Sequence, residues 1–194
     1  MSANLHCAAR HARLGLALAA LALGACNASN TVVSAPTSTV PQPTATAVPP
    51  TPTASGYPVR VFFSRHPETD SNVNAVFPVS RVSPTLGVGT YAIQQLIAGP
   101  TAAEAAAGHF TELTASLTGS SNCGGPDFTY TISGNTGTLK FCKQTQLAGD
   151  LTGARIQAEI VATLTQFPNV TKVIILNSSG HCFNDLSGAD MCLH

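Results

Sequence analysis

The sequence predicts one α+β domain whose elements follow the order β-β-α-β-β-α-β. Three observations carry this prediction. Short runs with alternating apolar residues are typical of strands, a long stretch with apolar residues at helical spacing is typical of a helix, and a nearly all-apolar run rich in Val and Ile is typical of a buried strand. This order implies an antiparallel or mixed sheet with helices packed on one face.

The first half of the domain is expected to hold two strands and a helix. Residues 57–63 predict a strand because β-branched and aromatic residues alternate there. Residues 76–82 predict a second strand, and Pro78 within it suits the edge of a sheet. Thr90 is expected to cap the helix that follows, and residues 101–104 fit a capping box at the start of a short alanine helix.

The second half is expected to hold a hairpin, a helix and a buried strand. Alternation at both ends of the segment 128–141 predicts the hairpin. Asp150 or Thr152 begins the clearest helix of the chain, and Glu159 is expected to lie off its apolar stripe. The stripe consists of Ile156, Ile160, Val161, Leu164 and Phe167. Residues 170–176 predict a strand covered on both faces.

The amino-terminal 25 residues have the layout of a secretory signal peptide. Arg10 and Arg13 precede an apolar run, 14–23, that is too short to span a bilayer. The run ends in Leu-Gly-Ala before Cys26, which resembles the lipobox of bacterial lipoproteins. The resemblance implies cleavage before Cys26, a diacylglycerol on its sulfur, and an extracytoplasmic protein held on a membrane by acyl chains such as palmitate. A signal peptide with an incidental cysteine is the alternative, and the choice between inner and outer membrane stays open.

Residues 27–56 are rich in Thr, Pro, Ala, Ser and Val and contain no charged residue. Such a composition cannot bury a core, and its prolines favour extended polyproline II. The segment 26–56 is therefore interpreted as a lipidated cysteine followed by a disordered tether. Residues 57–194 have the length of one ordinary domain.

Four cysteines remain in the domain once the leader and Cys26 are set aside: Cys123, Cys142, Cys182 and Cys192. An even number in an exported chain predicts two disulfides. The favoured pairing joins the first to the second and the third to the fourth, because each pair closes a short segment. The competing hypothesis is a zinc site built from His181, Cys182, Cys192 and His194, although zinc sites usually show closer cysteine spacing.

Charge and motifs exclude several classes of function. From Arg60 onward the chain has seven basic and nine acidic residues, which argues against nucleic acid as a partner. The sequence has no nucleophile elbow, phosphate loop or Cys-x-x-Cys motif, so no catalytic residue, cofactor or metal is predicted. The absence of such motifs favours a non-catalytic protein. The alternative hypothesis is a small envelope hydrolase or metal-dependent enzyme that uses the loop with His66, Glu68 and Asp70, or the tail with His181 and Cys182. A third hypothesis is a ligand receptor with an apolar pocket between helix and sheet.

Three segments together resemble the GerMN domain of sporulation and spore-germination proteins. They are residues 59–63, residues 96–104 and residues 162–170, the last with a Gln-Phe-Pro helix end before a strand. The chain departs from the family pattern near Cys123 and after Gly180.

The resemblance implies a non-catalytic module of the cell envelope, similar in element order to ring-building motifs. Its expected partners are another envelope protein, a cell-wall polymer or copies of itself. The family offers no catalytic residues to transfer. Residues 165–168 are interpreted as a buried helix end rather than a binding site.

Overall fold

The computed structural model describes residues 56–194, which contain the whole predicted domain. The predicted signal peptide, the predicted lipidation site at Cys26 and nearly all of the predicted tether lie outside the described residues. No helix in the part of the chain that the structure describes is long and apolar enough to cross a bilayer.

The first sheet has three strands in the order β2-β1-β3. Its centre is β1 (Tyr57–Arg65), which pairs antiparallel with β2 (Phe77–Ser83) and, over two residues, with β3 (His109–Phe110). The alternation seen in the sequence places Val59, Val61 and Phe63 in the core, where each is at most 4% exposed. Strand β2 is an edge strand, as its proline predicted.

The second sheet has the order β5-β6-β8. Strands β5 (Phe128–Ser133) and β6 (Thr136–Phe141) form the predicted hairpin, and β8 (Lys172–Leu176) lies parallel to β6. A parallel pair needs a long crossover connection, which helix α5 (Asp150–Thr165) supplies. A separate two-residue ladder joins β4 (Leu117–Thr118) to β7 (Gln144–Thr145).

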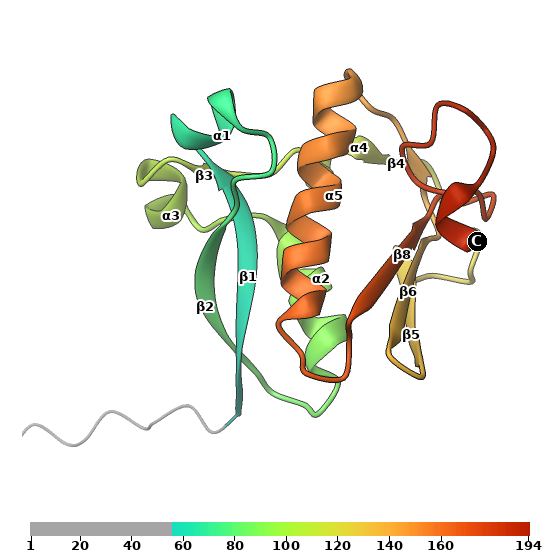
Figure 1. Cartoon of the computed structure of the whole chain (residues 1–194). Coiled ribbons are helices and arrows are strands. Elements are labelled where there is room, and N and C mark those ends of the chain that lie inside the picture. The colour runs from blue at the N-terminus through green and yellow to red at the C-terminus, as the bar shows by residue number, and fades with distance from the viewer. Residues whose placement is uncertain (1–55) are drawn as a thin grey trace, which may run out of the picture. The chain divides into compact units, whose positions relative to one another are not determined.

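Helices α2 (Val88–Ala98) and α5 lie between the two larger sheets (Figure 1). Both helices contact β1, while α5 also contacts β8 and α2 also contacts β5. The remaining helices are short: α1 (Glu68–Ser71), α3 (Ala102–Ala106), α4 (Leu113–Ser116) and the 3₁₀ turn η1 (Met191–Leu193). The two long helices therefore fill the interior that the sheets enclose.

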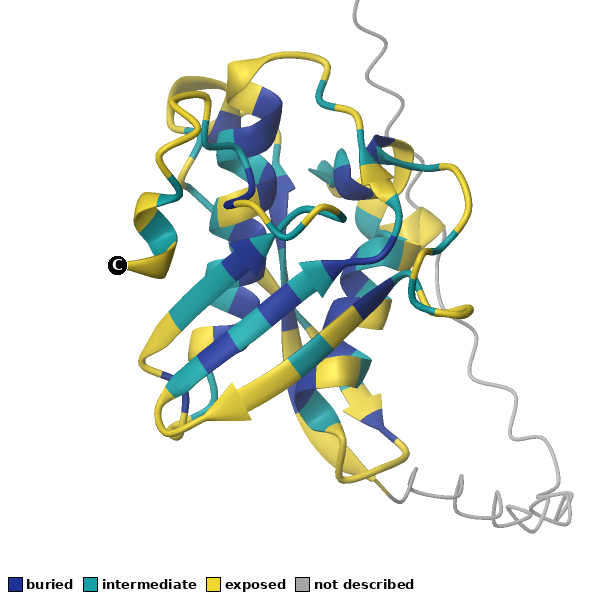
Figure 2. Ribbon diagram, turned by 90° about the vertical axis from the view of Figure 1, so that its right-hand side faces the viewer, coloured by how far each residue is buried: buried dark blue, intermediate teal, exposed yellow. Residues whose placement is uncertain are grey.

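The core lies where the inner faces of the sheets meet these helices. Burial alternates along β6 and clusters on the inner sides of α2 and α5 (Figure 2). The largest fully buried apolar side chains are Phe63, Phe141, Ile93, Leu96, Leu113, Leu139, Ile156, Ile160 and Leu164. Phe167 follows the end of α5 and still packs against this core.

The α+β class and the order of the main elements are confirmed. The strands divide into two three-stranded sheets because β1 and β6 each pair with their own neighbours and the helices separate them. Thr101 and Glu104 form the predicted capping box. The prediction that Thr90 caps α2 is wrong: the cap position lies three residues earlier, at Gly87, and the helix begins at Val88.

Candidate functional site

Two disulfides take up the four cysteines of the domain. Cys123 bonds Cys142 with their Cα atoms 5.5 Å apart, and Cys182 bonds Cys192 with a separation of 5.9 Å. These are the pairings that the spacing favoured. The first attaches the loop before β5 to the residue that follows β6, and the second closes the carboxyl-terminal segment into a loop.

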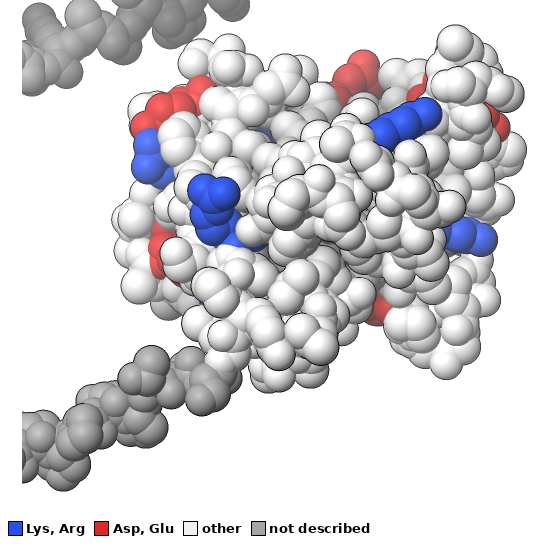
Figure 3. All heavy atoms as spheres, turned by 60° about the horizontal axis from the view of Figure 1, so that its bottom comes forward, with Lys and Arg blue, Asp and Glu red and all other residues white. Residues whose placement is uncertain are grey.

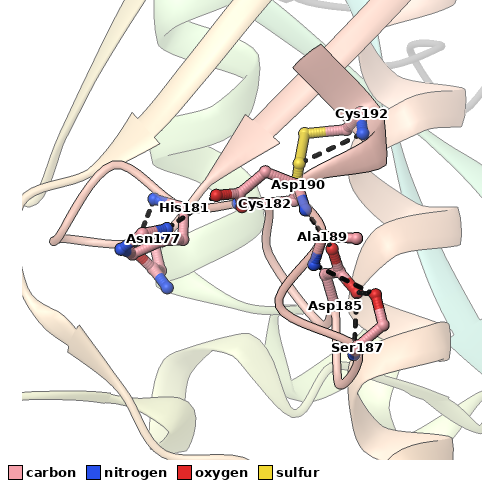
Figure 4. Close-up of a disulfide and its surroundings, with 8 residues drawn as sticks. All are labelled: Asn177, His181, Cys182, Asp185, Ser187, Ala189, Asp190 and Cys192. Atoms are coloured by element: carbon pink, nitrogen blue, oxygen red, sulfur yellow. Dashed lines mark hydrogen bonds and ion pairs between the residues drawn. A yellow bond between two sulfur atoms is a disulfide. The ribbon is translucent and has the colours of Figure 1, made fainter. Parts of the chain in front are cut away.

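The carboxyl-terminal loop is organised by two aspartates (Figure 4). Asp190 accepts a bond from the backbone N–H of Cys182 at 2.7 Å and lies 2.7 Å from Nδ1 of His181. Asp185 accepts bonds from the backbone N–H groups of Ser187 and Asp190, at 2.9 and 2.8 Å. These bonds, with His181 the main cause for Asp190 and Ser187 for Asp185, hold the pKa values of both carboxyls below their ordinary range.

The zinc hypothesis loses its thiolate ligands in this loop. Cys182, Asp185 and Asp190 do bring potential ligand atoms within 4.8 Å of one another. However, the sulfur of Cys182 is bonded to Cys192, and both carboxylates accept bonds that shape the loop. The arrangement is that of a disulfide-closed turn.

The polar loop after β1 divides into two pairs. Nδ1 of His66 lies 2.7 Å from Oδ1 of Asp70, and the imidazole stacks on Phe110 with ring centroids 4.2 Å apart. Arg65 donates to Glu68 at 2.7 Å, which lowers the pKa of that carboxyl. Among the described residues these side chains form no cluster of potential metal ligands. The loop therefore gives no support to the metal-dependent alternative.

A polar stripe on α5 hydrogen-bonds the edge of β1 that lies opposite β2. Side chains at positions i, i+4 and i+7 of the helix accept from alternate backbone N–H groups of the strand. The pairs are Ser64 N with Glu159 Oε1 (2.9 Å), Phe62 N with Thr163 Oγ1 (3.0 Å) and Arg60 N with Gln166 Oε1 (2.8 Å). Gln166 also donates to the carbonyl of Arg60 at 2.6 Å. Strand β3 pairs only with the end of this edge, at Ser64 and Arg65, so the side chains of the stripe take the place of a neighbouring strand along the rest of it.

Glu159 lies off the apolar stripe, as expected, but it is not solvent-exposed: it is fully buried within this polar stripe. Its second oxygen accepts from the hydroxyl of Thr111 at 2.6 Å. Burial raises the pKa of Glu159 to about 7 despite these bonds. The helix buries two faces, an apolar one and a polar one. The helical spacing of Glu159, Thr163 and Gln166 was the sequence signal that could have predicted the polar face. Residues 165–168 are a structural helix end, as expected, but the end is not buried throughout: Thr165 and Pro168 are exposed, and Gln166 binds β1.

The best candidate for a binding site is a groove between β5 and α2. One hollow of about 380 Å³ is lined by Leu86, the first residues of α2, Tyr130 and Ile132 of β5, and the turn after α5. A second hollow of about 320 Å³ continues along the same strand to Phe128. Thr90 lines both hollows, so they form one feature, here named the β5–α2 groove.

The β5–α2 groove is almost uncharged. Its one ionisable carboxylate among the lining residues is Asp127, which pairs with Lys143 at 2.7 Å. Leu86 is 77% exposed and Ile132 is 43% exposed at one end of the groove. From below, charged side chains lie mostly toward the margins of this end of the domain (Figure 3). A helix and a sheet thus border an open, mainly apolar hollow.

Two glycines give Tyr130 its place in the groove. A Cβ at Gly89 of α2 would lie 2.6 Å from the tyrosine ring, and one at Gly137 of β6 would lie 2.9 Å from its hydroxyl. Both contacts are shorter than van der Waals distance, so only glycine allows the ring to lie between the helix and the sheet. Burial raises the pKa of Tyr130 above its ordinary value.

The fold and its motifs define a GerMN-type domain. The family described as "Germane: Sporulation and spore germination" matches residues 60–178, and the chain belongs to this family. No curated protein matches the chain.

Two solved structures are similar to parts of the chain. The tandem GerMN domains of the sporulation protein GerM from Bacillus subtilis are 20% identical with a TM-score of 0.40, over 62% of this chain and 38% of that one. A Clostridium perfringens protein provisionally described as a lipoprotein is 18% identical with a TM-score of 0.31, over 64% of this chain and 76% of that one. The chain therefore spans well under half of the tandem-domain structure.

Proposed function

We propose that this protein is a non-catalytic binding module of the cell envelope, held on the extracytoplasmic side of a membrane by lipid on Cys26. One contrast carries the proposal. Most side chains that the sequence suggested for chemistry form ion pairs with neighbouring residues or disulfides, whereas the β5–α2 groove is open and nearly uncharged. Membership of a family described by sporulation and germination, rather than by a reaction, also supports it.

The anchor is supported by the lipobox-like run that ends at Cys26. Two or more acyl chains hold a protein on a bilayer durably, because each buried methylene contributes about 0.8 kcal/mol. The tether that follows would let the domain reach up to about 90 Å from the membrane if extended as polyproline II. The proposed partner is therefore another component of the envelope, within reach of the tether.

Fractionation of cells that express Cys26→Ala tests the anchor. The native protein is expected in the membrane fraction, with mass spectrometry showing an acylated amino terminus at Cys26. The variant is expected to be released or to keep its leader. Cys7→Ala is the matched control, because it removes the other leader cysteine without touching the lipobox. Unchanged membrane partition and normal processing of Cys26→Ala would reject the anchor.

Two measurements test the binding role against the enzymatic alternative. Thiol titration and metal analysis of the purified domain are expected to find four oxidised cysteines and no zinc. Free thiols with stoichiometric zinc would favour the metal-dependent enzyme instead. Chemical crosslinking in intact cells, followed by pull-down, is expected to yield discrete partners, and recovery of the uncrosslinked protein alone would contradict a binding module.

A further inference from the structure

We propose that the free edge of β5 binds an extended, uncharged segment of another protein as an added strand. The inference deepens the proposed function and rests on it, since it names the kind of partner that the binding module takes. In this mode of recognition, main-chain hydrogen bonds supply affinity and pockets for alternate side chains supply specificity. The β5–α2 groove offers both elements.

The backbone of β5 has hydrogen-bonding groups to spare. The strand pairs with β6 on one side, and no second strand joins it within residues 56–194. A two-residue turn connects the hairpin, with Gly134 at φ +55°, so Ser133 and Thr136 form its hydrogen-bonded closing pair. Because bonded and non-bonded pairs alternate, the N–H and C=O groups of every second residue point away from β6. These residues are Phe128, Tyr130 and Ile132.

An independent bond confirms this register. The N–H of Cys142 donates to the carbonyl of Asp127 at 2.8 Å, which extends the bonded pairs by one step beyond the strand. Three amides and three carbonyls therefore lie along the free edge, enough to pair a strand of about six residues.

The hollows below this edge can take side chains of an added strand. Successive side chains of a strand point to opposite faces, so every second residue of the added segment would point toward α2. The two hollows of about 380 and 320 Å³ lie at that level, one beside Ile132 and one beside Phe128. The intervening residues would lie beside the exposed side chains of Thr129 and Thr131 on the outer face.

The chemistry of the groove selects an uncharged partner. The carboxylate of Asp127 is already paired, and no other charged side chain lines the two hollows. A charge carried into this groove would lose its hydration without gaining a partner. Side chains such as Val, Leu or Thr suit the inward positions.

A single segment fits this edge better than β5 of a second copy. Antiparallel pairing of two β5 edges would bring both α2 helices to the same side of the joined sheet, beneath the shared edge. The two helices would then crowd the space beneath the shared edge. A single added segment brings no helix of its own, so its side chains could fill the hollows. Self-association through β5 would therefore contradict the proposal.

A phage-displayed library of 12-residue peptides, selected on the mature full-length protein in detergent, provides the probe. Selected peptides are expected to be uncharged with apolar residues at every second position. Thr90→Arg places a long charged side chain where the two hollows meet and is expected to weaken the binding of such a peptide at least about tenfold. Ser80→Arg is the matched control, because Ser80 is an exposed hydroxyl residue on the edge strand of the other sheet. It is expected to bind the peptide like the native protein.

A second measurement does not depend on any variant of the protein. N-methylation of the peptide at alternate residues, whose N–H groups would face β5, is expected to weaken binding at least about tenfold, with little effect at the intervening residues. Amide exchange at Phe128, Tyr130 and Ile132 is expected to slow when the peptide binds. Thr131, already bonded to β6, is expected to change little.

Four results would overturn the proposal: no enriched peptide, equal losses for both arginine variants, a uniform response to N-methylation, or a dimer of the native protein that Thr90→Arg disperses. The proposed function fails separately. If the Thr90→Arg variant still crosslinks to the same partners in cells, the partner surface lies outside the groove, and the proposal of a binding module stands. If crosslinking finds no partner at all, the proposed function fails while the peptide experiment still reports on the edge.

Discussion

Replacement of the buried carboxyl by an amide, Glu159→Gln, should make the domain more stable at alkaline pH. The Gln side chain keeps an oxygen that can accept from the N–H of Ser64 and gains an amide NH2 group that can donate to the hydroxyl oxygen of Thr111. The substitution removes a carboxyl whose charged form is disfavoured by burial. The native protein and the variant should therefore differ mainly in how stability depends on pH.

The direction in which stability changes with pH follows from the raised pKa of Glu159. The carboxyl titrates near 4.5 in the unfolded chain and near 7 in the folded domain, so protonation favours the folded state. This contribution is fully present below pH 4.5 and is lost as the pH rises through 7. Between pH 5 and pH 8 the native protein should lose about 2.5 kcal/mol relative to Glu159→Gln. For a domain of this size, that corresponds to a relative fall in Tm of about 8 °C.

Thermal and urea unfolding of both proteins from pH 5 to pH 8 would measure this difference. Parallel pH profiles would refute the reasoning, since they would mean that Glu159 titrates alike in the folded and unfolded chains. Glu112→Gln, with the measurements extended below pH 5, is a control of opposite sign. The bond from Arg155, 2.7 Å long, lowers the pKa of Glu112, so that carboxyl stabilises the fold above pH 4.5 and loses its effect as the pH falls.

Three further substitutions test the core, the polar stripe and a disulfide. Ile160→Asp places an unpaired charge at a fully buried position and should prevent folding, so a cooperative melt near the native Tm would exclude Ile160 from the core. Gln166→Ala should cost about 1–2 kcal/mol in urea unfolding by leaving two backbone groups of β1 without partners, whereas exposed Gln157→Ala should stay within about 0.5 kcal/mol of the native protein. Cys123→Ser combined with Cys142→Ser should cost about 3 kcal/mol, and an unchanged unfolding midpoint would show that the bridge adds no stability.

Features that depend on local sequence were predicted well. Alternation in β1 placed Val59, Val61 and Phe63 on one buried face, and the capping box at Thr101 formed as its spacing predicted. Both follow from periodicity or from contacts within four residues, which the order of residues determines directly. The start of α2 was predicted wrongly because the residue at its cap position is Gly87, which has no side chain to form a capping hydrogen bond. The sequence pattern therefore pointed to the nearby hydroxyl of Thr90 instead.

The environment of Glu159 could not be predicted from helical periodicity alone. A carboxylate on a helix ordinarily faces water, and it becomes internal here only because α5 lies along the edge of a strand that is 95 residues distant in sequence. The same limit applies to the β5–α2 groove, whose lining comes from three separated segments of the chain. Both features arise from tertiary packing.

The edges of the two larger sheets show why the uncovered edge of β5 matters. Strand β2 carries Pro78, the amides of β1 are bonded by side chains of α5, and β8 meets the carboxyl-terminal loop through a bridge between Leu176 and Cys182. Each device blocks or occupies an edge that would otherwise pair with another chain. Strand β5 (Phe128–Ser133) has neither a proline nor a charged residue, and hollows rather than a covering segment lie beside it. A domain that protects its other long edges and leaves this one open has kept the geometry that strand addition requires.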